Sequence, residues 1–170
     1  MPYLLLALIV IAVDQVSKWL VVTRMELGES IPVIGEFFQI YSHRNRGAAF
    51  GILQNQRWFF IVVTAVILAG IVWYFIRMRR ENNRGMSIAL GLLLGGALGN
   101  FIDRVRTGEV VDFFKFRFQF GLFGKEIDYT FAIFNVADTA IVVSVGLILL
   151  LTLLEGRKSK KEMTTYESEY

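Results

Sequence analysis

The chain of 170 residues contains no cysteine, one histidine (His43) and two prolines. Without cysteine there can be no disulfide bridge, thiolate nucleophile or cysteine-ligated metal, and one histidine cannot supply a zinc site of the HExxH type. Charged residues are also scarce, at 19% against 55% hydrophobic residues, and the mean hydropathy is +0.52. A soluble domain of this length carries more polar surface, so the composition indicates a membrane protein.

Four apolar runs approach the roughly 20 residues that a helix needs to cross a bilayer. They cover residues 2–22, 58–76, 85–102 and 131–154. The first is expected to be a retained helix, because a signal peptide would not contain Asp14 and Lys18 and no small-residue cleavage site follows. The sequence therefore predicts a membrane all-α bundle of four transmembrane helices.

Basic residues cluster beside two of these runs, which explains the net charge of +3 without nucleic-acid binding. Short loops rich in Arg and Lys stay in the cytoplasm, so both termini are expected inside and loops 23–57 and 103–130 outside. Residues 1–156 are expected to form a single membrane-embedded domain, and residues 157–170 a disordered cytoplasmic tail. The basic residues are Arg77, Arg79, Arg80 and Arg84 in the loop, and Arg157, Lys158, Lys160 and Lys161 in the tail.

The outer loops carry strand patterns. Residues 31–50 mix β-branched and aromatic residues with Gly and Pro, and residues 114–120 (FKFRFQF) alternate with period 2. This predicts a small extracytoplasmic β-rich cap with one aromatic face. The aromatic face is expected either to pack on the first outer loop or to lie in the lipid interface, where aromatic residues are favoured.

Polar residues inside the spans need a reason, because an ionisable group at membrane depth costs about 2.5–3.5 kcal/mol on insertion scales. Three polar patches fall in the outer half of the membrane in this orientation. One such patch could serve only to hold helices together by hydrogen bonds. Three patches at a common depth favour a functional site. By spacing, each patch occupies one helix face: Asp14 with Lys18, Asn100 with Asp103 and Arg104, and Asn135 with Asp138.

Carboxylates are the catalytic groups that this inventory leaves. Two facing carboxylates share a proton, so one can act as base and the other as acid in amide hydrolysis by water, without a metal. A serine–lysine hydrolase is disfavoured, because the neighbours Ser17 and Lys18 do not face each other on a helix. An ion-conducting protein and a non-catalytic scaffold are the alternatives from other classes. Composition leaves four aspartates eligible: Asp14, Asp103, Asp112 and Asp138.

Five segments, in this order on a chain with four spans, together resemble the bacterial lipoprotein signal peptidases (signal peptidase II). The likeness covers nearly everything except the C-terminal tail. The segments are DQVSK (14–18), NRGAAF (45–50), GGALGNFIDR (95–104), VVDF (110–113) and FNVAD (134–138).

The resemblance implies a multi-pass aspartic endopeptidase of the bacterial inner membrane. Such enzymes cut the signal peptide from a prolipoprotein just before its diacylglyceryl-modified cysteine. The cut is made at the outer surface of the inner membrane. By motif match Asp112 and Asp138 are the catalytic dyad, with Asp103 as the rival for the first position. The supporting or substrate-binding residues would be Asp14, Lys18, Asn45, Gly47, Asn100, Asp103, Arg104, Asn135 and Ala137.

Asn135 is expected to orient Asp138 by hydrogen bonding. No metal or cofactor is implied, and the expected partners are lipid-modified precursors and phospholipids, with the protein as a monomer. One departure concerns the stretch between Asp112 and Asp138, which is longer and more aromatic than the family pattern. In place of a short amphipathic helix, we expect a hairpin-like cap over the lipid-facing entrance.

Overall fold

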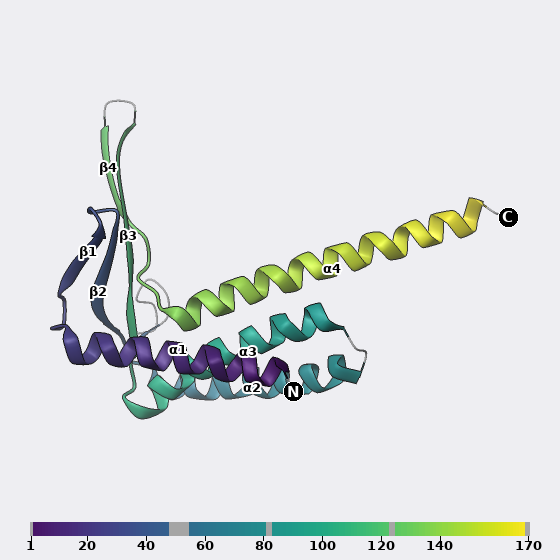
Figure 1. The fold of residues 1–170 in the computed structure, drawn as a ribbon, viewed down its shortest axis with the longest axis horizontal. Helices are drawn as coiled ribbons and strands as arrows, with labels where there is room; N and C mark the ends of the chain where they lie inside the picture. Colours follow the sequence, from purple (N-terminus) through teal and green to yellow (C-terminus); the bar gives the residue numbers. More distant parts are fainter. Residues whose placement is uncertain (1, 48–54, 81–82, 123–124, 169–170) are drawn as a thin grey trace.

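The computed structural model describes residues 2–47, 55–80, 83–122 and 125–168 (Figure 1). Its four helices are α1 (Pro2–Arg24), α2 (Arg57–Arg80), α3 (Arg84–Arg106) and α4 (Val136–Ser168). All four contain a stretch long and apolar enough to cross a membrane. The predicted bundle of four transmembrane helices is therefore confirmed.

Two helix boundaries differ from the sequence expectation. Helix α3 continues one turn beyond residue 102 to Arg106, and α4 begins at Val136 instead of near residue 131. The tail, expected to be disordered, has helical backbone as far as Ser168. Residues 157–168 contain no glycine or proline and are rich in good helix formers, so they extend a helix that is already nucleated.

A four-stranded antiparallel sheet forms the predicted cap. Its order is β1 (Ser30–Ile34), β2 (Phe38–Asn45), β3 (Val110–Leu122) and β4 (Lys125–Thr130). Strand β2 pairs with the first half of β3, and β4 pairs with the second half. In Figure 1 the sheet lies at one end of the bundle, and the β3–β4 hairpin extends across the direction of the helices.

The predicted aromatic face divides into two halves. Near the bundle, Phe116 stacks on Phe38 of β2 with ring centroids 4.8 Å apart, and on Phe134 at 5.8 Å. This half therefore packs on the first outer loop, as one of the two alternatives predicted. Further along the strand, Phe118 contacts Phe37 edge-on at 5.4 Å but remains partly exposed, and Phe120 is exposed.

Helix α3 lies at the centre of the bundle and packs against each of the other three helices. Three glycines four residues apart allow α1 to approach α3 closely: a Cβ at Gly91 would lie 2.8 Å from the carbonyl oxygen of Tyr3, and one at Gly95 would lie 2.8 Å from Val10 Cβ. At Gly99 the added atom would instead meet the carboxylate of Asp14, at 2.6 Å. The third contact therefore places the packing of α1 on α3 beside the polar residues of the spans. These residues and Asp112 are called the polar layer below: Asp14, Lys18, Asn100, Asp103, Arg104, Asp112, Asn135 and Asp138.

Candidate active site

The start of α4 is fixed by a reciprocal pair of hydrogen bonds. The Asp138 backbone N–H donates to Asn135 Oδ1 (2.9 Å), and the Asn135 backbone N–H donates to Asp138 Oδ2 (3.1 Å). This is a capping box, in which a residue at the helix start and one three positions later satisfy each other's backbone donors. The same local geometry that begins the helix therefore holds the Asp138 carboxylate in place.

Asp112 lies at the start of β3 and is 2% exposed. The facing strand advances three residues between Ile40 and His43 while β3 advances two, which is a β-bulge. A bulge changes which side chains of a strand share a face, and here it places Asn45 beside Asp112. Asn45 Nδ2 donates to Asp112 Oδ2 (3.0 Å), and Asn135 Nδ2 donates to Asp112 Oδ1 (2.7 Å).

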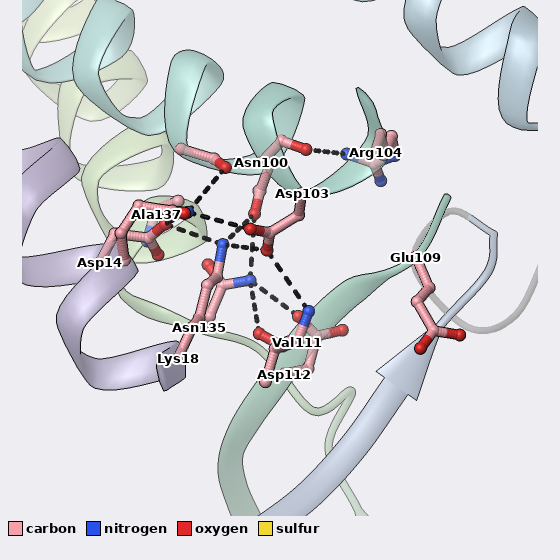
Figure 2. A network of polar contacts seen from close by, with 12 residues as sticks. Asp14, Lys18, Asn100, Asp103, Arg104, Glu109, Val111, Asp112, Asn135 and Ala137 are labelled. Atoms are coloured by element: carbon pink, nitrogen blue, oxygen red, sulfur yellow. Dashed lines mark hydrogen bonds and ion pairs between the residues drawn. The ribbon is translucent and has the colours of Figure 1, made fainter. Parts of the chain in front are cut away.

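Asn100 of α3 connects the two aspartates to the rest of the polar layer (Figure 2). Its Nδ2 donates to Asp138 Oδ1 (2.7 Å), and its Oδ1 accepts from Asn135 Nδ2 (3.1 Å) and from Lys18 Nζ (2.9 Å). Each oxygen of Asp112 and Asp138 thus receives an N–H donor. Asn135 contacts both aspartates, one through its backbone and one through its side chain, as expected for an orienting residue.

The other two aspartates of the layer hold Lys18 between them. Lys18 Nζ lies 2.8 Å from Asp14 Oδ2 and 2.9 Å from Asp103 Oδ2, so the predicted pairing with Asp14 is confirmed. Gln15 Nε2 adds a hydrogen bond to Asp103 Oδ1 (2.9 Å). The Ser17 hydroxyl donates to the carbonyl oxygen of Asp14 (2.8 Å), which leaves the serine–lysine alternative without support.

Asp14 also contacts α4. Its Oδ1 accepts the backbone N–H of Ala137 (2.9 Å), so a carboxylate of α1 satisfies one of the free donors at the start of α4. Ala137 is fully buried, and a Cβ added at Gly96 of α3 would lie 2.5 Å from its carbonyl oxygen. The close approach of three helices therefore positions the turn that carries Asp138.

Arg104 connects the layer to the first outer loop. Its guanidinium donates to the carbonyl oxygen of Gly47 (3.3 Å) and lies 4.9 Å above the ring of Phe60. The Gly47 backbone N–H in turn donates to Asn45 Oδ1 (2.9 Å), which orients that side chain toward Asp112. The remainder of the NRGAAF segment, residues 48–50, lies outside the described residues.

A cavity of about 560 Å³ opens beside the two asparagine-held aspartates, Asp112 and Asp138. Asn45, Asn100, Arg104 and Thr139 complete its polar wall. The remaining lining is apolar and comes mainly from the segment before α4 and the first turns of α4: Phe131, Ala132, Ile133, Phe134, Ile141, Val142 and Val143. Asp14, Lys18 and Asp103 do not line this cavity.

Burial raises the pKa of Asp112 to about 7, and the nearby charge of Asp138 acts in the same direction. The amide donors of Asn45 and Asn135 oppose this by stabilising the ionised form. Asp138 lies in the first turn of α4, where the helix macrodipole favours a negative charge. A protonated carboxyl and an ionised one beside the same cavity can act as acid and base in hydrolysis.

All eleven residues predicted for the site lie in or beside one connected layer, including Ala137 and Gly47, which contribute backbone groups. Two contributors were not predicted. Gln15 bridges α1 and α3, and Arg57 donates to the carbonyl oxygens of Arg104 (3.0 Å) and Val105 (2.6 Å) at the end of α3. Gln15 falls inside the DQVSK segment, but its contact to another helix has no signature in the sequence.

Residues 6–154 match the family described as signal peptidase (SPase) II. The chain belongs to the signal peptidase II family. It is therefore a protease that removes signal peptides from prolipoproteins, and a multi-pass protein of the bacterial inner membrane.

Two curated lipoprotein signal peptidases match nearly the full length of the chain. The chain is 54% identical over 157 residues to a lipoprotein signal peptidase of Shouchella clausii, covering 92% of this chain and 96% of that protein. The corresponding protein of Brevibacillus brevis is 52% identical over 163 residues, covering 94% of this chain and all of the relative.

Two solved structures resemble the fold, each described as a bacterial membrane enzyme determined by the in meso method. The one at 2.3 Å resolution has a TM-score of 0.79 and 43% identity, over 91% of this chain and 89% of the other. The one at 1.9 Å resolution has a TM-score of 0.75 and 44% identity, over 89% and 92%. The bundle with its β cap is therefore a shared architecture.

Proposed function

We propose that Asp112 and Asp138 are the catalytic dyad with which this peptidase cuts a prolipoprotein just before its diacylglyceryl-modified cysteine. The observation that carries the assignment is their common position on the cavity. Both carboxyls line it, and only amide and backbone N–H groups donate hydrogen bonds to them within the described part of the chain. Asp14 and Asp103, by contrast, are held by an ammonium group away from the cavity.

The reaction begins with a water molecule between the two carboxyls and the scissile peptide carbonyl. Asp138, ionised, takes a proton from the water as its oxygen attacks the carbonyl carbon. Asp112, protonated, donates its proton to the carbonyl oxygen, and a tetrahedral diol forms. As the diol collapses, Asp138 donates its proton to the leaving amide nitrogen and Asp112 takes a proton from a diol hydroxyl. The C–N bond breaks, and the dyad again holds one proton.

The apolar wall of the cavity supports entry of the substrate from the lipid. Ile141, Val142 and Val143 line it from α4, and Val142 is 71% exposed on a helix that crosses the membrane. A signal helix can dock here while the acyl chains of the modified cysteine remain in the bilayer. The scissile bond is then extended beside the dyad at the outer interface, with both termini of the enzyme in the cytoplasm and the enzyme acting as a monomer.

The decisive experiment replaces each dyad residue by its isostere. Asp112→Asn and Asp138→Asn keep the side-chain volume but cannot transfer the proton, so we expect cleavage of a purified lipid-modified precursor to fall by at least about 10³-fold. Glu126→Gln, an exposed acid on β4, is the matched control and should cleave at the wild-type rate. Normal turnover by either dyad variant would refute the assignment.

A further inference from the structure

The β3–β4 hairpin beyond its contact with β2 has two chemically different faces. Phe118 is paired with Tyr129 and Phe120 with Ile127, so these four side chains share one face. The opposite face carries Arg117, Gln119 and Asp128. Arg117 Nε donates to Asp128 Oδ1 (2.8 Å) and its Nη1 to Glu36 Oε2 (2.7 Å), so Arg117 is paired with one acid of this face and with one between β1 and β2.

The apolar face is largely uncovered by the chain. Phe118 meets the ring of Phe37 edge-on, with centroids 5.4 Å apart, and is still 39% exposed. Phe120 is 50% exposed and Tyr129 48%. The single polar atom on these side chains is the hydroxyl of Tyr129. A contiguous aromatic face exposed to water is unfavourable, and such faces mark surfaces that contact lipid or a partner.

The position of the hairpin identifies the occupant as lipid. Strand β3 begins four residues after α3 ends at Arg106, so the sheet lies at the outer end of the membrane-spanning helices. The hairpin then runs across the helix direction, along the expected membrane surface (Figure 1). At about 3.4 Å per residue, residues 117–122 carry it roughly 20 Å beyond its pairing with β2. The exposed Trp58 at the start of α2 marks the same interface.

The exposed aromatic face is also continuous with the cavity. Val110 and Asp112 line the cavity. Every second residue of a strand points to the same side, so these two share one face of β3 with Phe114, Phe116, Phe118 and Phe120. The face that carries Asp112 at one end therefore carries exposed aromatic rings at the other. The charged face with Arg117 and Asp128 points the opposite way, toward water.

We propose that the outer half of the β3–β4 hairpin lies in the lipid–water interface of the outer leaflet, with Phe118, Phe120, Ile127 and Tyr129 against the lipid. The hairpin holds the cap on the membrane beside α4. It also provides an apolar surface along which the acyl chains of a modified precursor reach the cavity. The lipid contact does not depend on which aspartates are catalytic.

Site-directed spin labelling tests the lipid contact directly, because the chain contains no cysteine and single cysteines can be introduced freely. Nitroxides are attached to Phe120→Cys and to its neighbour Gln119→Cys, in vesicles of phosphatidylethanolamine and phosphatidylglycerol. We expect the label at 120 to collide several-fold more with oxygen than with a water-soluble nickel complex, and the label at 119 to show the reverse. Tyr129→Cys and Thr130→Cys provide a second pair on β4.

Equal accessibility of the two faces would overturn the proposal. So would a label at 120 that meets the nickel complex in vesicles and becomes protected only when precursor or another protein is added, since the face would then belong to that partner. In a second measurement, Phe118→Ser combined with Phe120→Ser should raise KM for a lipid-modified precursor in vesicles several-fold at unchanged kcat, with Gln119→Ser as control. An unchanged KM would contradict the role in substrate approach.

Discussion

Asp14 and Asp103 lie on either side of an ammonium group, whereas Asp112 and Asp138 receive their hydrogen bonds from amides. Lys18 Nζ is 2.8 Å from Asp14 and 2.9 Å from Asp103, and Lys18 and Asp14 are almost completely buried. Asp112 and Asp138 are held by Asn45, Asn100 and Asn135. Both pairs belong to one hydrogen-bonded layer, so the difference between them lies in charge and access.

Under the proposed function, Asp14 and Asp103 are a structural pair, and Asp112 and Asp138 are the catalytic pair. Breaking a buried pair of a carboxylate and a cation is strongly destabilising, because it leaves an uncompensated buried charge. Asp112 and Asp138 form no ion pair within the described part of the chain, although the guanidinium of Arg104 lines the same cavity and acts on both through space. Two such carboxyls can share one proton, which is the state required for acid–base catalysis. Among the four aspartates of the layer, only Asp112 and Asp138 line the cavity.

Removing the cation should give the largest change in stability. Lys18→Met leaves the carboxylates of Asp14 and Asp103 buried without a counter-charge. We expect the free energy of unfolding to fall by about 3–5 kcal/mol. The measurement is the thermal unfolding midpoint in detergent micelles. Lys125→Met, on the exposed β4, should leave the midpoint unchanged. Equal midpoints for the two variants would mean that Lys18 does not stabilise the first pair.

A smaller loss of stability is expected when an added side chain displaces Asp14. In Gly99→Ala the added Cβ would lie 2.6 Å from Asp14 Oδ2, so the carboxylate must move away from Lys18 and from the start of α4. We expect a destabilisation of about 1–3 kcal/mol. Gly70→Ala in α2 meets no atom within 4 Å and should be neutral or slightly stabilising. If both substitutions behave alike in thermal unfolding, close packing at Gly99 does not position Asp14.

The smallest effect concerns Asp112 and is a shift in the pH dependence of kcat/KM. The pKa of Asp112 is raised to about 7 by burial and by Asp138, so its proton is lost and kcat/KM should fall as the pH rises above that value. The Asn45 amide lowers this pKa by stabilising the carboxylate. In Asn45→Ala the alkaline limb should therefore move to higher pH, whereas in Gln119→Ala it should stay in place. A shift to lower pH would contradict the assigned sign.

Much of this layer was predictable from spacing along the chain. The pairing of Asp14 with Lys18 follows from their separation by four residues on one helix face, and the contact between Asn135 and Asp138 follows from their separation by three. Alternation of aromatic and polar residues predicted the strand that became β3. These features depend only on local geometry, which the sequence expresses directly.

Contacts between segments distant in sequence were not predictable in the same way. The bulge in β2 decides that Asn45, and not its neighbour Arg44, reaches Asp112. The hydrogen bond from Gln15 to Asp103 depends on how closely α1 approaches α3. Composition therefore left four aspartates eligible, and only the resemblance ranked Asp112 above Asp103. The position of the cavity supplies a physical reason for the same ranking.

The most direct test of the central claim compares Asp112→Asn with Asp103→Asn, the two rivals for the first catalytic position. Cleavage of a lipid-modified precursor is measured at equal amounts of folded protein, together with the thermal unfolding midpoint of each variant. We predict that Asp112→Asn loses cleavage at an undiminished midpoint, and that Asp103→Asn lowers the midpoint while the folded fraction still cleaves. Cleavage retained by Asp112→Asn and abolished in folded Asp103→Asn would contradict the account.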